Sequence, residues 1–249
     1  MINEPIDIWV EELSAGDDEY FYYWNFLDFN ERTKALRFVQ EKHRHYYVIS
    51  HGKLRAILSS YIHIAPKKIQ FATGAYGKSF VVADGKPHNL KFNLSHSDNR
   101  MIVAVGYHDN IGVDIEVWKG NVDCQVIVQE CFAEVEATYW KGLPDNAKPA
   151  AFYRFWTRKE SFAKAVGAGI TLGVSRVITS VDEPTRFLSL PDDYGAVSGW
   201  AVVDLDFGLG ISGALTVNAD SIGQISLKSL SATNTDCERV KINTNSNSY

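Results

Sequence analysis

An alternating stretch at residues 111–118, with the sequence IGVDIEVW, constrains the fold more than any other part of this chain. Its aliphatic residues alternate with Asp114 and Glu116, and a period of two is typical of a half-buried β-strand whose two acids share one face. Neighbouring carboxylates repel each other unless a cation lies between them, and hard oxygen ligands of this kind favour Mg²⁺ or Mn²⁺. The alternative is an edge strand with a charged, solvated face. The rest of the sequence has to distinguish a divalent-metal site from such an edge.

The composition limits the class of protein to which this strand can belong. Of the 249 residues, 45% are hydrophobic and 22% are charged, which is ordinary for one globular domain or two small ones. No apolar run is long enough to span a bilayer, and the acidic N-terminus lacks the layout of a secretory signal, so we expect a cytoplasmic protein with no membrane partner. The three cysteines form no CxxC pair and support neither a disulfide framework nor a zinc site. The net charge of -5 argues against a general nucleic-acid-binding protein.

A basic segment at residues 32–55 differs from this acidic background. Local positive charge in an acidic protein suggests a specific anionic ligand, although a solvated helix face would carry the same kinds of residue. The basic residues of the segment are Arg32, Lys34, Arg37, Lys42, Arg44, Lys53 and Arg55.

The first half of the chain predicts a mixture of helices and strands. We expect a strand at residues 6–10, a helix with Asn30 as its N-cap, and a second helix at residues 46–64. Residues 101–107 and 111–118 are two apolar strands, and the short polar segment between them predicts a hairpin.

The second half repeats this order of helix followed by strands. Helices are expected at residues 122–128, 132–140 and 150–166, and strands at 176–181, 200–207, 211–217 and 224–230. The pattern favours an α+β protein of two related subdomains, residues 1–110 and 111–230. A polar tail at residues 231–249 is expected to be disordered.

The helix expected at residues 150–166 carries a further acid. Trp156, Glu160 and Lys164 are spaced four residues apart and therefore form one ridge beside an apolar stripe. A glutamate with a lysine one turn later is commonly a surface ion pair worth ~0.3–0.5 kcal/mol. A capping box at residues 157–160 is another alternative, but the helical pattern already runs upstream of it. If the acid binds a metal and the lysine faces a phosphate, the ridge forms part of a phosphate site.

The segment FNLSHS at residues 92–97 is small and polar and comes directly before a strand. Ser95 and His96 supply a hydroxyl and an imidazole, which together with exposed backbone N–H groups can donate hydrogen bonds to phosphate oxygens. A lone histidine at such a place is more often a turn residue. Neither this segment nor the acidic ridge is sufficient by itself to assign a function.

Taken together, FNLSHS, GVDIE at residues 112–116 and FWTRKESFAKAVGAGI at residues 155–170 resemble the 4′-phosphopantetheinyl transferases of the Sfp type. The three motifs occur in that family's order, and the resemblance extends over residues 32–170. It implies a pseudo-twofold α+β fold in one chain, with two similar subdomains that each combine a helix with an antiparallel sheet. It also implies a Mg²⁺-dependent reaction in which the phosphopantetheine arm of coenzyme A moves onto a serine of a carrier protein and 3′,5′-ADP leaves.

The resemblance assigns roles to the acids and to the lysine of the ridge. It makes Asp114, Glu116 and Glu160 the ligands of Mg²⁺, or of Mn²⁺ in its place, and it places Lys164 at the leaving phosphate. The proton of the attacking serine needs an acceptor, for which Glu160 is the first candidate and Glu136 the second.

The contacts to the nucleotide of coenzyme A depart from the family pattern at two positions. The usual Gly-Lys-Pro appears as Gly-Lys-Ser at residues 77–79, so we align Lys78, although a true Gly-Lys-Pro follows at residues 85–87. Many relatives carry an arginine where this chain has Tyr46, and Arg44 or His45 is the candidate to substitute for it. The expected phosphate contacts are Ser95 and His96, with Arg32, Lys34 and Arg37 for the 3′-phosphate.

These expectations describe an active, monomeric transferase whose partners are coenzyme A and an acyl or peptidyl carrier protein. Because such carriers are typically acidic and the net charge of this chain is -5, docking is expected to use a local apolar or basic patch. One alternative is a Mg²⁺-dependent pyrophosphatase or nucleotide hydrolase that attacks with water through the same acids. The other is a catalytically silent module that binds coenzyme A or a carrier domain.

Overall fold

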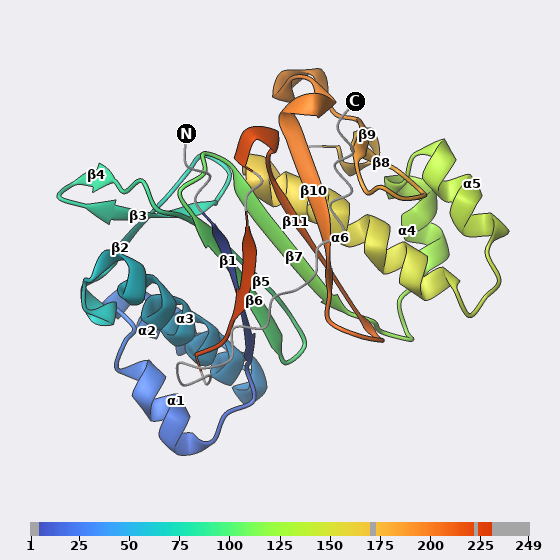
Figure 1. The fold of residues 1–249 in the computed structure, drawn as a ribbon. Helices are drawn as coiled ribbons and strands as arrows, with labels where there is room; N and C mark the ends of the chain where they lie inside the picture. The colour runs from blue at the N-terminus through green and yellow to red at the C-terminus, as the bar shows by residue number, and fades with distance from the viewer. Residues whose placement is uncertain (1–4, 170–172, 222–223, 231–249) are drawn as a thin grey trace.

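The computed structural model describes residues 5–169, 173–221 and 224–230 (Figure 1). These residues form an α+β protein in which two main sheets lie between two groups of helices, and the predicted fold class is confirmed. The tail predicted at residues 231–249 lies outside the described residues.

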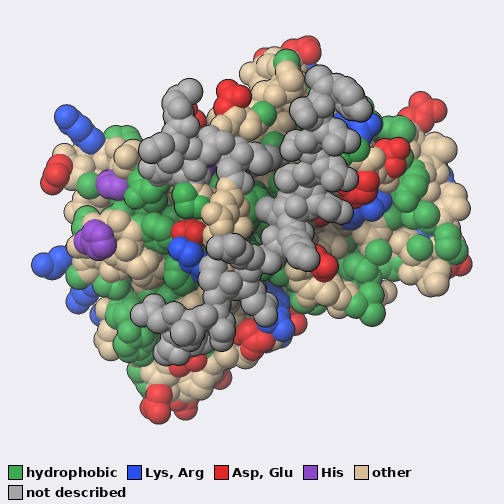
Figure 2. Space-filling view, in the orientation of Figure 1, with side chains coloured by type: hydrophobic (Ala, Val, Ile, Leu, Met, Phe, Trp, Pro, Cys, Tyr) green, Lys and Arg blue, Asp and Glu red, His purple; other side chains and the backbone are tan. Residues whose placement is uncertain are grey.

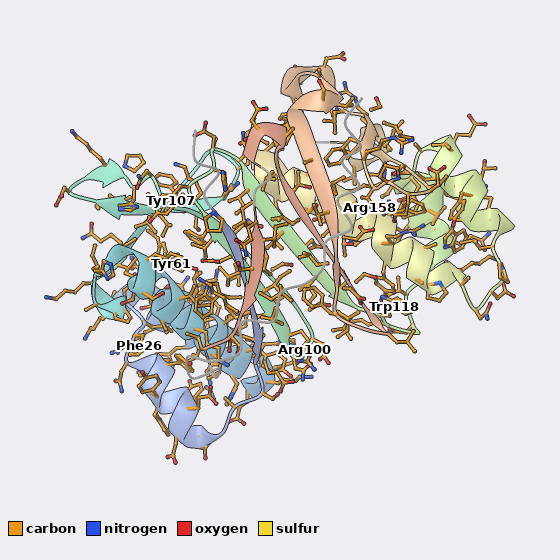
Figure 3. All side chains as sticks on the ribbon, viewed as in Figure 1. Phe26, Tyr61, Arg100, Tyr107, Trp118 and Arg158 are labelled. Atoms are coloured by element: carbon orange, nitrogen blue, oxygen red, sulfur yellow. The ribbon has the colours of Figure 1, made fainter. Side chains whose placement is uncertain are left out.

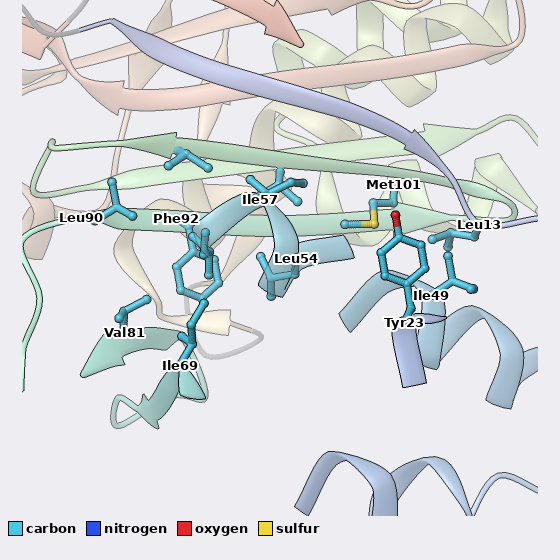
Figure 4. Packing of buried hydrophobic residues seen from close by; sticks show 13 residues of the cluster. Leu13, Tyr23, Ile49, Leu54, Ile57, Ile69, Val81, Leu90, Phe92 and Met101 are labelled. Carbon is cyan, nitrogen blue, oxygen red and sulfur yellow. The ribbon is translucent and has the colours of Figure 1, made fainter. Parts of the chain in front are cut away.

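The first subdomain combines a four-stranded sheet with helices and a small second sheet. Its elements in chain order are β1 (Ile6–Glu12), α1 (Asp17–Trp24), α2 (Phe29–Ala35), α3 (Glu41–Ile62), η1 (Pro66–Lys68), β2 (Gln70–Thr73), β3 (Ser79–Ala83), β4 (Lys86–Pro87), β5 (Lys91–Ser97) and β6 (Arg100–Gly106). The main sheet has the order β12-β1-β6-β5 and takes β12 (Ile225–Lys228) from the far end of the described chain. Helix α3 covers its outer face, where Leu54 and Ile57 pack in one cluster with Phe92 and Met101 (Figure 4).

The second subdomain combines a three-stranded sheet with a long helix. Its elements are β7 (Ile111–Val117), α4 (Cys124–Cys131), α5 (Glu134–Gly142), α6 (Lys148–Val166), η3 (Val174–Arg176), β8 (Ile178–Thr179), β9 (Phe187–Ser189), η4 (Asp192–Tyr194), η5 (Val197–Gly199), β10 (Trp200–Asp206), β11 (Ile211–Asn218) and η6 (Ala219–Ser221). The sheet has the order β10-β11-β7, and α6 packs across β7 and β11. The Arg158 guanidinium of α6 donates from Nε to Asp204 Oδ1 of β10 over 2.7 Å and so ties the helix to the sheet. Figure 3 labels Arg158.

The inner faces of the two main sheets pack against each other. Ile8 and Ala104 of the first sheet lie in one buried cluster with Val113, Ile115 and Leu215 of the second. This shared core brings β5 next to β7, each at the edge of its own sheet. The acids of β7 therefore lie at the boundary between the two subdomains.

The hairpin predicted for residues 101–107 and 111–118 is wrong. β6 pairs with β1 and β5, whereas β7 pairs with β11, so the chain leaves one sheet and enters the other between these two strands. Nearly every side chain of β6 is buried because this strand has a partner on each edge and a packed layer on each face. A short polar connection between apolar strands is compatible with either arrangement.

Three helices begin upstream of their predicted starts. The N-cap of α2 is Asp28 instead of Asn30, because the Asp28 carboxylate accepts from Glu31 N–H while the Glu31 carboxylate accepts from Asp28 N–H. α3 begins at Glu41 and not at residue 46. α6 begins at Lys148, two residues before its predicted start, with the expected proline in its first turn, and its predicted end is confirmed, with Gly167 as C-cap at a φ of 71°.

Candidate active site

Strand β7 and helix α6 bring three carboxylates together at the boundary between the subdomains. Asp114 and Glu116 alternate along β7, and Glu160 comes from the part of α6 that packs on this strand. Burial raises the pKa of Glu160, and the charges of Asp114 and Glu116 raise it further. Burial and the Asp114 charge likewise raise the pKa of Glu116. The three predicted metal ligands are therefore near enough to destabilise one another's ionised forms.

Asp114 is the most buried of the three acids, with 3% of its surface exposed. Burial raises its pKa, and the Lys164 cation opposes this shift. One of its oxygens, Oδ2, is buried without a hydrogen-bond partner. A buried carboxylate oxygen without a partner costs free energy, which a cation at this place would recover.

The donor chemistry of this cluster fits a hard divalent cation. Its ligands are carboxylate oxygens, which Mg²⁺ and Mn²⁺ prefer, and Glu160 makes no hydrogen bond or ion pair with another described residue. The three side chains do not yet enclose an ion, because no group of three or more His, Cys, Asp or Glu residues within the described ranges is arranged to hold one.

Lys164 joins helix α6 to both edge strands. Its Nζ lies 2.5 Å from Asp114 Oδ1 and donates to Ser95 Oγ over 2.8 Å. Ser95 in turn donates to the same oxygen of Asp114 over 2.8 Å. The lysine follows Glu160 by one helical turn, as the ridge predicts, and places a cation beside the acids.

A cleft of about 570 Å³ lies beside this cluster. Glu160 and Lys164 line it from α6, and His51 lines it from α3 on the opposite subdomain. Asn93 and Leu94 of β5 contribute a further wall. The cleft is large enough for part of a nucleotide-sized ligand and places that ligand against the acids and the lysine.

His96 lies next to Ser95 on β5 with an exposed side chain. Partial burial of the imidazole lowers the pKa of His96, and the nearby positive charges of Lys164 and His51 lower it further. Three basic side chains from different elements therefore converge near the cleft. This grouping is suited to an anion.

The predicted nucleotide lysine, Lys78, lines the cleft, but its ammonium group already has protein partners. Nζ donates to the carbonyl oxygens of Ile111 and Ala165 over 2.9 and 2.7 Å, and so bridges β7 and the last turn of α6. Burial, together with the Lys91 charge, lowers its pKa to about 8. Lys78 therefore has a structural role at the wall of the cleft, where it links β7 to α6, in addition to placing a positive charge near a ligand.

The four predicted cations of the basic segment do not line this cleft. Arg32 donates to the carbonyl oxygen of Trp24 at the end of α1, and Lys34 lies over the Tyr47 ring. Arg44 lies 3.6 Å from Glu41, and Arg37 is exposed on the segment that follows α2. The residues that line the cleft are Asp28, Asn30, Glu31, His51, Leu54, Phe71, Tyr76, Gly77, Lys78, Ser79, Phe92, Asn93, Leu94, Glu160, Ala163, Lys164, Gly167 and Gly169.

Sequence reasoning did not assign His51 to the site. Its Nδ1 lies 3.2 Å from Glu31 Oε1, and Arg55, which is fully buried, binds both Glu31 and Asp28. The pKa of Glu31 is lowered in spite of its burial, because His51 and Arg55 stabilise the ionised form. The available sequence signals were the four-residue spacing of His51 and Arg55 on one helix and the Asp-x-x-Glu capping pattern upstream.

Glu136, the second candidate base, has a structural position instead. It is fully buried, and its carboxylate pairs with Lys159 over 2.7 Å. The same carboxylate accepts from Ala133 N–H and from the N–H and hydroxyl of Thr179. Both of its oxygens are occupied inside the protein, so no proton acceptor is left for a substrate.

Two family models match the chain, and together their ranges contain the residues of this site. The 4′-phosphopantetheinyl transferase superfamily model matches residues 110–201, and the 4′-phosphopantetheinyl transferase N-terminal model matches residues 13–108.

Individual proteins of known name show the same similarity. The 4′-phosphopantetheinyl transferase HetI of Nostoc sp. is 28% identical over 206 residues, which cover 82% of this chain and 84% of the relative. The 4′-phosphopantetheinyl transferase psf-1 of Bacillus pumilus is 30% identical over 168 residues, covering 67% and 70%. The 4′-phosphopantetheinyl transferase Sfp of Bacillus subtilis is 26% identical over 183 residues, covering 73% and 78%.

Proposed function

The chain belongs to the 4′-phosphopantetheinyl transferase superfamily and is an enzyme of that class, and we propose that it acts on apo acyl or peptidyl carrier proteins. In the proposed reaction the serine oxygen of the carrier forms a bond to the β-phosphorus of coenzyme A. The bond from that phosphorus to the bridging oxygen breaks, and 3′,5′-ADP leaves. The phosphopantetheine arm is thereby attached to the carrier.

The acids at the subdomain boundary are the proposed ligands of a divalent cation. Asp114, Glu116 and Glu160 would hold Mg²⁺, or Mn²⁺ in its place, and the buried, unpartnered Oδ2 of Asp114 supports this assignment. When bound there, the ion would neutralise the pyrophosphate of coenzyme A and the charge that develops on the transferred phosphorus.

Side chains of this protein are proposed to accept the proton of the carrier serine and to orient the phosphates of coenzyme A. Glu160 is the proposed acceptor of the serine proton, because its carboxylate lines the cleft and makes no hydrogen bond or ion pair with another described side chain. Lys164 Nζ is the proposed donor to the departing phosphate oxygen, for which it would exchange its contact with Asp114. His96, beside the cleft, supplies a further donor to a phosphate of the nucleotide.

One observation carries this proposal above the others. Glu160 and Lys164 line the same cleft, and Lys164 also ion-pairs with Asp114 of the neighbouring strand. The cleft, Asp114 and the proposed donor are thus connected through one ridge of α6.

The proposal includes a monomeric, cytoplasmic enzyme with no nucleic-acid partner. Both subdomains lie in one chain, which supports the monomer. Within the described ranges, no helix combines the length and apolar character that a membrane crossing needs.

Docking of the carrier is proposed to use a local patch. Figure 2 shows hydrophobic, acidic and basic side chains interspersed over the face it presents. Leu36 and Val39 are 65% and 99% exposed, and Lys34 and Arg37 beside them are exposed as well. An apolar contact flanked by positive charge suits an acidic carrier, and its affinity should vary only weakly with salt. A steep loss of affinity between low and moderate salt would contradict such a contact.

The direct test is the intact mass of an apo carrier domain after incubation with the enzyme, coenzyme A and Mg²⁺. We expect the carrier to gain one phosphopantetheine, and we expect no gain with a chelator or with Glu160→Gln. The control is Glu134→Gln, which changes an exposed glutamate of α5 and should leave the gain unchanged.

Two other outcomes correspond to the alternatives. Consumption of coenzyme A without any gain by several carriers would favour the Mg²⁺-dependent hydrolase, which uses the same acids and attacks with water. Binding of coenzyme A that is independent of Mg²⁺, with no product at all, would favour the silent binding module.

A further inference from the structure

The two edge strands at the subdomain boundary are joined by side chains in place of a backbone ladder. β5 and β7 lie side by side but belong to different sheets. Alternate side chains of β5 reach across and accept hydrogen bonds from alternate backbone N–H groups of β7. The contacts are Val113 N to Asn93 Oδ1 at 2.8 Å, Ile115 N to Ser95 Oγ at 3.4 Å and Val117 N to Ser97 Oγ at 3.1 Å.

The two serines of this set also bind the acids of β7. Ser95 donates its hydroxyl proton to Asp114 Oδ1 over 2.8 Å, and Ser97 donates to Glu116 Oε2 over 2.7 Å. A hydroxyl has one proton and two lone pairs, so a serine that accepts from the backbone and donates to a carboxylate has a fixed orientation. Both serines are 5% exposed, which restricts them further.

This geometry changes the role expected for Ser95. Its only proton is directed at Asp114, and its oxygen accepts from Lys164 and from the backbone. A phosphate oxygen needs a donor, and Ser95 has none left in this arrangement. The hydroxyl is better suited to holding the acid than to holding the substrate.

We propose that β5 is a positioning strand, in which Ser97 aims the Glu116 carboxylate and Ser95 aims that of Asp114 for the divalent cation. This inference rests on the proposed function, since it assumes that these acids hold a metal. The repeat Asn-x-Ser-x-Ser thereby has a physical explanation, because the period of two along β5 matches the period of two along β7. Neither serine is a catalytic residue in this scheme.

Ser97 gives the clearer test of the two. Ser95 also contacts Lys164, so its removal would disturb the proposed donor to the leaving group. Ser97 contacts Glu116 and the backbone of Val117, and it does not line the cleft. Its removal should therefore affect the metal site without a direct effect on coenzyme A.

The experiment measures binding of Mn²⁺ to the full chain by paramagnetic resonance, without coenzyme A or carrier. We expect Ser97→Ala to weaken Mn²⁺ binding by roughly 10-fold, the lower end of what loss of an outer-shell partner costs. We expect Ser97→Ala to have no further effect when it is combined with Glu116→Gln, because the hydroxyl acts through that carboxylate. Ser60→Ala, which removes an exposed serine of α3, should bind Mn²⁺ like the unchanged protein.

Two results would overturn the inference while leaving the proposed function intact. The first is unchanged Mn²⁺ affinity in Ser97→Ala. The second is the same loss of affinity with and without Glu116→Gln, which would mean that Ser97 only joins the sheets. If the unchanged protein transfers no phosphopantetheine to any carrier, the proposed function fails. If it also binds no Mn²⁺, the positioning role fails with it.

Discussion

Lys164 Nζ of α6 lies 2.5 Å from Asp114 Oδ1 of β7, and this ion pair holds the most buried acid of the site against the helix that carries Glu160. The pair is asymmetric, because the Asp114 side chain is 4% exposed and that of Lys164 is 29% exposed. The lysine can therefore turn toward a ligand in the cleft, whereas the aspartate stays where it is. The difference in exposure fits the two proposed roles, in which Lys164 donates to the substrate and Asp114 binds the metal.

Replacement of Lys164 by methionine should separate transfer from metal binding. We expect the rate of phosphopantetheine transfer to fall by about 100-fold or more, since a donor to developing charge is removed. Above pH 7, Mn²⁺ affinity should stay the same or rise by up to about 3-fold, because Lys164 is not a ligand and the loss of its positive charge removes a repulsion for the ion. The measurements are carrier mass against time and paramagnetic resonance, with Lys141→Met on exposed α5 as control. Loss of Mn²⁺ binding in Lys164→Met would mean that the lysine mainly keeps Asp114 in place.

Removal of the metal should affect stability more at high pH than at low pH. The pKa values of Asp114, Glu116 and Glu160 are raised, first by burial, so the metal-free folded protein binds more protons than the unfolded chain between the ordinary and the raised values. The contribution of these acids to stability therefore falls as pH rises through that window. A bound cation favours the ionised forms and offsets the loss.

The measurement is the rise in Tm on addition of Mg²⁺. We expect a larger rise at about pH 8 than at about pH 5.5, because protons compete with the ion at the lower pH. The double variant Asp114→Asn with Glu160→Gln should show little rise at either pH. An equal rise at both pH values in the unchanged protein would mean that the ion binds elsewhere.

The acids and the lysine could be predicted from the sequence because each lies on a regular element with a clear period. Alternation along β7 places Asp114 and Glu116 on one face, and four-residue spacing places Glu160 and Lys164 on one ridge. The ends of α6 are equally local, since they depend on a proline and a glycine. Local patterns of this kind survive tertiary packing.

The contacts between distant elements could not be predicted in the same way. Arg32 is basic in the sequence, but its guanidinium binds the carbonyl oxygen at the end of α1, and charge alone does not say which way a side chain turns. The side-chain bonds from β5 to β7 join residues twenty positions apart, and the Asn-x-Ser-x-Ser repeat of β5 does not show which strand lies beside it. The false hairpin between β6 and β7 has the same origin, because strand pairing depends on which sheet each strand enters.

The backbone contact between β7 and α6 should tolerate no side chain at residue 112. A Cβ added to Gly112 would overlap the carbonyl oxygen of Ser161 and the backbone nitrogen of Ala165. We expect Gly112→Ala to destabilise the protein by ~3 kcal/mol or more, because two packed backbones would have to separate. Urea unfolding measures the loss. Gly120→Ala is the control, since nothing lies within 4 Å of its added Cβ, and it should change the unfolding free energy by no more than ~0.5 kcal/mol. A folded Gly112→Ala of ordinary stability would show that α6 can move away from the acids.

Glu136 and Glu160 should respond in opposite ways to the same substitution. Glu136→Gln removes the counter-ion of the fully buried Lys159, so we expect a loss of about 3–5 kcal/mol in the free energy of unfolding. Below its unfolding temperature, this variant should transfer phosphopantetheine at a rate within about 3-fold of the unchanged enzyme, because Glu136 has no oxygen free for a substrate. Glu160→Gln should lose transfer and keep its stability, since Glu160 has no protein partner among the described residues and its burial disfavours the charge. Urea unfolding and the carrier mass assay on both variants decide between the two acids. A large loss of rate in Glu136→Gln at unchanged stability would restore it as a candidate base.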